Sequence, residues 1–171
     1  MFDSPWERPR GGPNRYGDLN PEPIYTAMGR AISNWEGVEA ATLVLMKGMT
    51  SDTAKIEMFE RTFKVRDRAR QILDTAITAL ISPCESVASA RFQQHIRAAM
   101  EQYIGWSERR NDVAHGYVTP MWSQHPSFES IVQSFSLCPS HTNPAKWSHG
   151  EPYYNLNAED IEAFATSFKN L

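Results

Sequence analysis

Three long segments with helical periodicity constrain the fold of this chain more than any other feature. The first begins near Pro23, and the residues of its expected buried face recur in steps of three and four. They are Ile24, Met28, Ile32, Trp35, Val38, Thr42, Leu45 and Met49. This spacing predicts a helix with one buried face. Gly48 closes the helix, and residues 50–52 (TSD) offer an N-terminal cap to the next one.

The second segment, residues 51–82, predicts another long helix. Its expected inward positions are Ile56, Phe59, Phe63, Ala69, Ile72, Ala76 and Leu80. Pro83 ends the helix, because proline has no amide hydrogen and disfavours helical geometry in the residue before it.

The third segment begins near residues 84–86 and covers about 30 residues, roughly 45 Å at the helical rise. Its stripe consists of Phe92, Ile96, Ala99, Tyr103, Trp106, Arg110 and Val113. Long helices joined by short connectors bury their stripes best against one another. The sequence therefore predicts an all-α fold, an antiparallel helical bundle.

Both ends of the chain differ from these three segments. Residues 1–21, with many prolines and glycines, predict an irregular N-terminal arm that Trp6 and Tyr16 would attach to the body. Residues 157–170 predict a final helix, capped by Asn157, that docks on the bundle. Its stripe is Ile161, Phe164, Ala165 and Phe168.

A chain of 171 residues has room for one domain with one core, so we expect residues 22–171 to form a single domain. Within it, residues 117–155 predict a loop-rich insertion with many prolines, serines, histidines and aromatic residues. Residues 127–138 alternate in part and predict a possible short strand.

The composition is that of a soluble globular protein, with 41% hydrophobic and 22% charged residues. The net charge of −3 excludes a strongly basic protein that binds nucleic acid through its overall field, so any such contact must be local. Two cysteines fall far short of a disulfide framework and favour a reducing compartment. We find no apolar core of signal-peptide length at the N-terminus and no run of 18 apolar residues, which predicts a cytoplasmic protein without a membrane segment.

The third segment ends in the stretch WSERRNDVAHGY, residues 106–117. Asn111 and His115 are four residues apart and share a helical face. Arg110 lies about 140° around the helix from His115, so a straight helix would separate them. They meet only if the helix bends near its end or if a second copy of the chain brings its own pair alongside. Gly116 suits such an ending, because glycine tolerates the left-handed cap conformation.

The helix terminus also tunes the chemistry of the histidine. The negative end of the helix dipole favours protonated His115, whereas the positive charge of Arg110 opposes it. General acid–base catalysis requires an imidazole that can both take up and release a proton.

The stretch ERRNDVAHG resembles the motif of the HEPN superfamily (higher eukaryotes and prokaryotes nucleotide-binding domains). In that family an arginine, usually followed by a polar residue, precedes a histidine by four to six positions at the end of a long bundle helix. Arg110, Asn111 and His115 fill the three places. Residues 31–45 also resemble the first helix of bacterial members, and the basic second helix fits. The resemblance covers about residues 22–116, and only the short motif is specific.

The resemblance implies a homodimer whose two motifs face each other across a cleft, and for many members a metal-independent endoribonuclease without a cofactor. RNA supplies its own nucleophile, the 2′-hydroxyl, so the protein need only move protons and stabilise charge. In this interpretation His115 is the general base or acid, and Arg110 grips the phosphate. Asn111 orients the imidazole or the phosphate, and Glu108 holds an arginine in place. By family analogy the protein is a toxin or defence effector with a cognate antitoxin or regulator.

Three other interpretations of the same residues stay open. His115 can simply satisfy helix-end carbonyls while Arg110 pairs with Glu108 or Asp112. The same bundle can be a non-catalytic module that binds a nucleotide, RNA or a protein partner. It can also be a purely structural helical dimer.

Other candidate residues carry less information. Arg61, Lys64 and Arg68 share a helical face that can contact an RNA backbone or be a solvated face paired with nearby acids. The ligand-type residues Cys138, His141 and His149, with His125 nearby, lack the second close pair of a recognised zinc pattern, so we predict no metal site. The later aromatic residues can stack bases or cover the end of the bundle. They are Trp122, Phe128, Trp147, Tyr153 and Tyr154.

Overall fold

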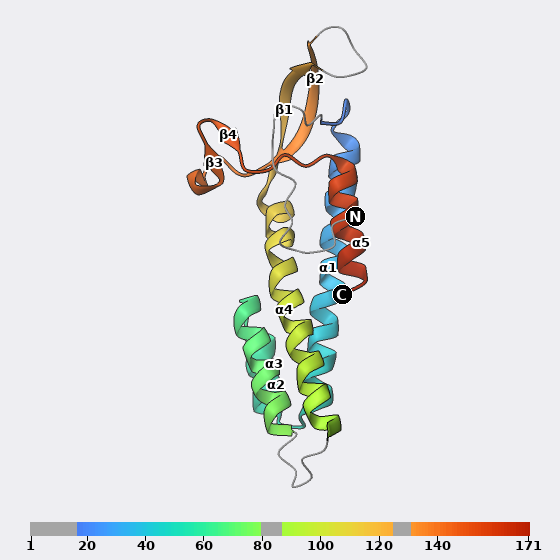
Figure 1. The fold of residues 1–171 in the computed structure, drawn as a ribbon, viewed down its shortest axis with the longest axis vertical. Helices are drawn as coiled ribbons and strands as arrows, with labels where there is room; N and C mark the ends of the chain where they lie inside the picture. The colour runs from blue at the N-terminus through green and yellow to red at the C-terminus, as the bar shows by residue number, and fades with distance from the viewer. Residues whose placement is uncertain (1–16, 80–86, 125–130) are drawn as a thin grey trace. The chain divides into compact units, whose positions relative to one another are not determined.

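The computed structural model describes residues 17–79, 87–124 and 131–171, and this part of the chain is mainly helical (Figure 1). Its helices are α1 (Glu22–Met49), α2 (Thr53–Arg61), α3 (Val65–Ala79), α4 (Val87–His115), the 3-10 turn η1 (Pro144–Lys146) and α5 (Ala158–Lys169). Its strands are β1 (Tyr117–Gln124), β2 (Ile131–Cys138), β3 (Trp147–Ser148) and β4 (Glu151–Pro152). The prediction of a mainly helical chain is thus confirmed, and the structure adds two antiparallel strand pairs to it.

The chain divides into two compact units. The helical unit, residues 36–107, holds α2, α3, most of α4 and the second part of α1. The hairpin unit joins residues up to 35 with residues 108–170, and so holds the beginning of α1, the end of α4, the strands and α5. Among the described residues, no helix is long and apolar enough to cross a membrane.

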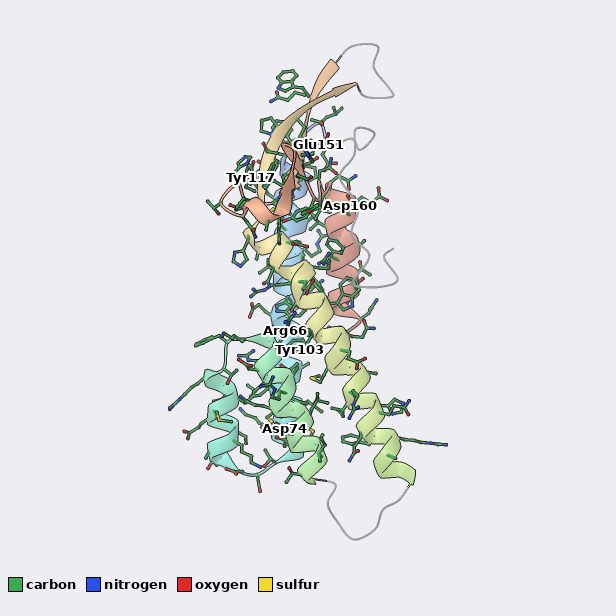
Figure 2. The ribbon with its side chains drawn as sticks, turned by 60° about the vertical axis from the view of Figure 1, so that its left-hand side comes forward. Arg66, Asp74, Tyr103, Tyr117, Glu151 and Asp160 are labelled. Atoms are coloured by element: carbon green, nitrogen blue, oxygen red, sulfur yellow. The ribbon has the colours of Figure 1, made fainter. Side chains whose placement is uncertain are left out.

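The helical unit is held together by a polar contact inside its core. The buried Tyr103 of α4 donates from its hydroxyl to both carboxylate oxygens of Glu39 in α1, each at 3.1 Å (Tyr103 is labelled in Figure 2). Arg68 of α3 pairs with the same carboxylate, and its guanidinium carbon lies 5.4 Å from the ring centroid of Phe59 in α2. One carboxylate therefore links α1, α3 and α4.

The predicted second helix is two helices, because the chain leaves helical geometry at Thr62. Thr62 is extended (ψ 116°), and its hydroxyl donates back to the Met58 carbonyl at 2.8 Å. Its own carbonyl accepts a bond from Arg68 Nε. Side-chain bonds of this kind compete with the helical ladder. Phe63, predicted to face inward, follows the break and is 90% exposed.

The buried face of α1 differs by one position from parts of the predicted stripe. Ile24, Trp35, Val38 and Thr42 are buried as predicted. Ala27, Ala31 and Met46 are also buried, whereas Met28, Ile32, Leu45 and Met49 are half-buried. Two adjacent apolar residues can both satisfy a period of 3.6, so the spacing alone does not decide which one faces the core.

In the second predicted segment, Phe59, Ala69, Ile72 and Ala76 are buried as predicted, Ile56 is half-buried, and Leu80 lies outside the described residues. In α4, Ile96, Tyr103, Trp106 and Val113 are buried as predicted, whereas Phe92 and Ala99 are exposed. Most of the apolar periodicity is therefore confirmed in both regions.

The position of the C-terminal helix and its buried face are both confirmed. Asn157 caps α5 by accepting from the Asp160 amide at 2.9 Å, and Asp160 accepts from the Asn157 amide at 3.1 Å, a capping box (Asp160 is labelled in Figure 2). The predicted stripe of Ile161, Phe164, Ala165 and Phe168 is buried.

In the hairpin unit α5 lies beside the beginning of α1 (Figure 1). The rings of Trp35 and Phe168 meet edge to face, with their centroids 5.3 Å apart. Asn34 Nδ2 donates to the Ala165 carbonyl at 2.8 Å. These contacts join two segments more than 130 residues apart in the sequence.

The segment 117–155, predicted to be loop-rich, contains a regular antiparallel hairpin. Its register pairs Tyr117 with Cys138 and Gln124 with Ile131. The predicted strand over 127–138 is confirmed for Ile131–Cys138, and β1 went unpredicted because Pro120 interrupts its strand pattern. Its partner is Phe135.

Residues 1–16 of the predicted N-terminal arm, with Trp6 and Tyr16, lie outside the described residues. The next residues are attached to the hairpin unit. The Asp18 amide donates to the Phe135 carbonyl at 2.8 Å, and the Asp18 side chain accepts from the Ala158 amide at 2.7 Å.

Gly116, which separates α4 from β1, does not have the predicted left-handed conformation; among the described glycines Gly150 has a positive φ. A side chain at Gly116 would instead be too close to its neighbours. A Cβ there would lie 2.8 Å from the Asp112 carbonyl oxygen and 2.8 Å from Leu137 Cδ1. The glycine thus permits close approach between the end of α4 and strand β2.

Candidate functional site

His115 is the last residue of α4, and its side chain is exposed. The helix is continuous to that residue. Asn111 lies one turn earlier and is also exposed, on the same face as predicted.

Arg110 lies on a different face of α4 and is half-buried. Its Nη1 donates to Asn111 Oδ1 at 3.0 Å. Its buried Nε has no hydrogen-bond partner in the part of the chain that the structure describes. Arg110 thus touches the motif through Asn111 rather than through His115.

His115 and Asn111 line a polar pocket of about 470 Å³ in the hairpin unit. The other lining residues are Ser140, Thr142, Asn143, Lys146 and Tyr154. Asn111 and His115 come from α4, and the rest from the segment after β2. None of these seven residues carries a carboxylate, and Arg110 is not among them.

Lys146 supplies the fixed positive charge of this pocket. It ends the 3-10 turn η1, and its Nζ lies 2.6 Å from Asp112 Oδ1. Asp112 is 2% exposed, and its backbone carbonyl accepts from the Tyr154 hydroxyl at 3.2 Å. The Lys146 ammonium also lies 5.8 Å from the centroid of the Tyr154 ring. The turn is therefore tied to the last turns of α4.

The second partner of Asp112 is Arg109, whose Nη2 lies 3.4 Å from Asp112 Oδ2. Arg109 is 1% exposed, and it also pairs with Glu108 at 3.2 Å. Of the two adjacent arginines, Arg109 is thus the buried structural one. The arginine that pairs with Glu108 is therefore Arg109.

An aromatic cluster borders the pocket. It consists of Tyr117, two residues after His115, together with His141 and Trp147 (Tyr117 is labelled in Figure 2). The rings of His141 and Trp147 are stacked, with their centroids 4.6 Å apart and an interplanar angle of 22°. The Tyr117 hydroxyl bonds to His141 Nε2, and Trp147 Nε1 donates to the Ser140 carbonyl at 3.3 Å.

Sequence reasoning missed both Lys146 and this aromatic cluster. Among the aromatic residues it named, Trp147 joins the cluster and Tyr154 is buried. Trp122 and Tyr153 are exposed, and Phe128 lies outside the described residues. A usable signal was Asp112, an acid at a buried helical position that needs a cation from elsewhere in the chain.

The candidate metal ligands Cys138, His141 and His149 do not form a cluster. Among the described residues, no group of three or more His, Cys, Asp or Glu side chains can hold a metal ion. Cys138 is fully buried, and burial raises the pKa of its thiol to about 12, which disfavours the thiolate that metals bind. His125 lies outside the described residues.

The basic residues of the second predicted segment do not share one helical face, because the helix breaks at Thr62. Arg61 ends α2, Lys64 lies between the helices, and Arg68 points to Glu39. Three other arginines, Arg66, Arg70 and Arg97, surround a pocket of about 520 Å³ between α3 and α4. Its remaining lining residues are mostly apolar.

Comparisons of the chain with protein-family models, with curated proteins and with solved structures found no match.

Proposed function

We propose that the chain is a metal-independent endoribonuclease of HEPN type, built on an antiparallel helical bundle and active as a homodimer. The observation that carries this proposal is the placement of His115. Its imidazole is exposed at the end of α4 and lines a polar pocket that also contains a lysine and no carboxylate. Such a pocket attracts a phosphodiester and brings a proton-transfer group to it.

The reaction is an internal transesterification. The 2′-oxygen of RNA attacks the adjacent phosphorus and loses its proton, and the bond from phosphorus to the 5′-oxygen breaks as that oxygen gains a proton. The products are a 2′,3′-cyclic phosphate and a 5′-hydroxyl. His115 serves one of the two proton transfers, a role worth about 10²- to 10⁴-fold in rate. Because the nucleophile belongs to the substrate, the reaction needs no cofactor.

A homodimer would explain how Arg110 can act together with His115. Within one chain Arg110 does not line the pocket of His115. In a symmetric pair the guanidinium of one copy can reach the pocket of the other, where it stabilises charge on the phosphate. Asn111 accepts a hydrogen bond from Arg110 and also lines the pocket. This position suits a residue that orients the imidazole or the phosphate.

The direct experiment incubates the purified protein with single-stranded RNA in EDTA. We expect cleavage that yields cyclic phosphate ends, and a loss of at least 100-fold in rate for His115→Ala. His95→Ala is the matched control, since it removes an exposed histidine of α4 outside the pocket. RNA with 2′-deoxyribose at the cleavage position should be resistant. Unchanged cleavage by His115→Ala would refute the assignment.

A non-catalytic module that binds RNA, a nucleotide or a protein is the second candidate. It is favoured by the fact that the pocket and its Lys146–Asp112 contact are complete in one chain without Arg110. If the unmodified protein and His115→Ala bind RNA equally and neither cuts it, this candidate is correct. A cytoplasmic role as a toxin or defence effector, restrained by an antitoxin or regulator, rests on family analogy.

A further inference from the structure

We infer that the pocket of His115 and the stacked pair His141–Trp147 together bind one phosphate and the neighbouring base of an unpaired RNA strand. The identification of the ligand as RNA rests on the proposed function. The phosphate subsite and the base subsite are inferred from the geometry of the hairpin unit.

Lys146 can bind the phosphate through its ammonium group. An ammonium group has three hydrogen-bond donors, and Asp112 occupies one of them at 2.6 Å. Asp112 lies buried behind the pocket and also pairs with Arg109, so two cations share its charge. The Lys146 side chain is 28% exposed and lines the pocket, so its other donors can face a ligand there.

The rest of the pocket suits an oxyanion as well. Its lining contains amide groups from Asn111 and Asn143, which can donate to phosphate oxygens. The hydroxyl groups of Ser140 and Thr142 bond to each other at 2.8 Å, so one donates within the pair and the other keeps its proton for a phosphate oxygen. A volume of about 470 Å³ exceeds that of one phosphate and leaves room for its sugar. No lining residue carries a carboxylate, and the Asp112 carboxylate that pairs with Lys146 is buried behind it and shared with Arg109.

The base subsite lies beside the pocket because successive residues of the loop after β2 face alternately the pocket and the aromatic cluster. Ser140 and Thr142 line the pocket, and His141 between them belongs to the aromatic cluster. His141 is exposed, and its ring is fixed by stacking on Trp147 and by the tilted Tyr117 ring, whose centroid lies 4.7 Å away and whose hydroxyl bonds to it. The base therefore stacks at the Trp147 end of this cluster. A prearranged aromatic surface beside a phosphate site is the arrangement that proteins use to hold single-stranded nucleic acid without sequence preference.

The geometry favours an unpaired strand over a duplex. A base can stack on a protein ring only after it leaves the stack of its own helix, and the groove of an RNA duplex does not present base faces. We therefore expect the site to select single-stranded regions and to tolerate any base.

Binding is measured by fluorescence anisotropy in EDTA with a labelled 2′-O-methyl RNA, which cannot be cleaved because its nucleophile is blocked. The unmodified protein should bind the single strand at least tenfold more tightly than the matched duplex. Lys146→Ala and Lys146→Gln should both weaken binding about tenfold and lower the slope of log affinity against log salt by about 0.7. Lys169→Ala, an exposed lysine of α5, is the charge control and should change neither.

Trp147→Ala and His141→Ala should weaken binding of the single strand about tenfold and leave the salt slope unchanged. An abasic strand, which keeps the phosphates and lacks the bases, should bind the unmodified protein more weakly and lose nothing further in Trp147→Ala. Circular dichroism verifies that each variant is folded, and Lys146→Gln keeps the inference testable if Lys146→Ala is not.

The outcomes separate this inference from the proposed catalysis. Selective binding of the single strand with these losses, but no cutting of ordinary RNA, would support the binding site and refute the ribonuclease. The opposite result is that RNA is cut, but single strand and duplex bind equally or the Lys146 and Trp147 variants bind as the unmodified protein does. This result would refute the binding site and leave the ribonuclease.

Discussion

The Lys146 ammonium lies 2.6 Å from a carboxylate oxygen of Asp112, and this contact joins a short turn of the C-terminal segment to the end of α4. The carboxylate is 3% exposed at its side chain and is shared with Arg109, which is equally buried at 2%. A buried acid between two cations fixes the wall of the pocket that contains His115. Its removal deprives the buried Arg109 of its buried partner and leaves it with the partly exposed Glu108.

Asp112→Asn should therefore lower the free energy of unfolding by about 3 kcal/mol, because Arg109 keeps its charge and loses its buried partner. Urea denaturation measures the change. Glu57→Gln is the control, since it removes an exposed pair with Arg61 at 3.8 Å and should cost less than about 0.5 kcal/mol. Equal losses in the two variants would show that the Asp112 cluster is not buried as described.

Gly116 and Gly29 should respond in opposite directions to the same substitution. Gly116→Ala places a Cβ 2.8 Å from Leu137 Cδ1 of β2, so α4 and β2 must separate, at a cost of about 1–3 kcal/mol. Gly29→Ala lies inside α1 with no atom within 4 Å of the new Cβ, and should stabilise by about 0.5–1 kcal/mol. Thermal unfolding compares them, and a stabilising Gly116→Ala would contradict the close approach.

The parts of the fold that the sequence predicted are those encoded by neighbouring residues. The final helix is the clearest case, since Asn157 supplies the cap and the stripe from Ile161 to Phe168 supplies the buried face. Both signals act within a few residues, and tertiary contacts agree with them. The same holds for the motif at the end of α4, where Asn111 and His115 share a face.

The features that escaped prediction depend on long-range contacts or on competing local bonds. The break at Thr62 arises from a side-chain bond to Met58 and from Arg68, which points to Glu39 in another helix. Lys146 reaches Asp112 across 34 positions of sequence, and no periodic pattern encodes such a pair. Arg110 was placed in the stripe of α4, yet the buried arginine is Arg109, because only Arg109 has Asp112 and Glu108 as partners.

Tyr103 should make the stability of the protein sensitive to alkaline pH. Burial, and next the charge of Glu39, raise the pKa of its hydroxyl to about 12 from the ordinary value of 10. The folded state therefore favours neutral Tyr103, and the stabilisation is fully present below pH 10 and is lost as pH rises toward 12. Over that interval the free energy of unfolding should fall by at most about 1.4 kcal/mol per pH unit from this group.

The comparison with Tyr103→Phe isolates this effect. The variant cannot ionise at that position, so its stability should fall less steeply between pH 10 and pH 12. Urea denaturation at several pH values gives the two slopes, and the difference in tyrosinate absorbance between the two proteins follows the titration of Tyr103. Parallel slopes in the two proteins would show that the Tyr103 hydroxyl titrates as it does in water.

Mixing two inactive variants tests whether the catalytic pocket is completed by a second chain. Arg110→Ala and His115→Ala should each fail to cut RNA alone. If Arg110 of one copy serves His115 of the other, a mixed dimer holds one intact site, and random pairing should restore about a quarter of the wild-type sites. The control mixes Arg110→Ala with the double variant Arg110→Ala/His115→Ala, in which no chain supplies Arg110. A mixture that forms dimers by sedimentation and stays inactive would place both residues in one chain's site, although Arg110 does not line the pocket of His115 within one chain.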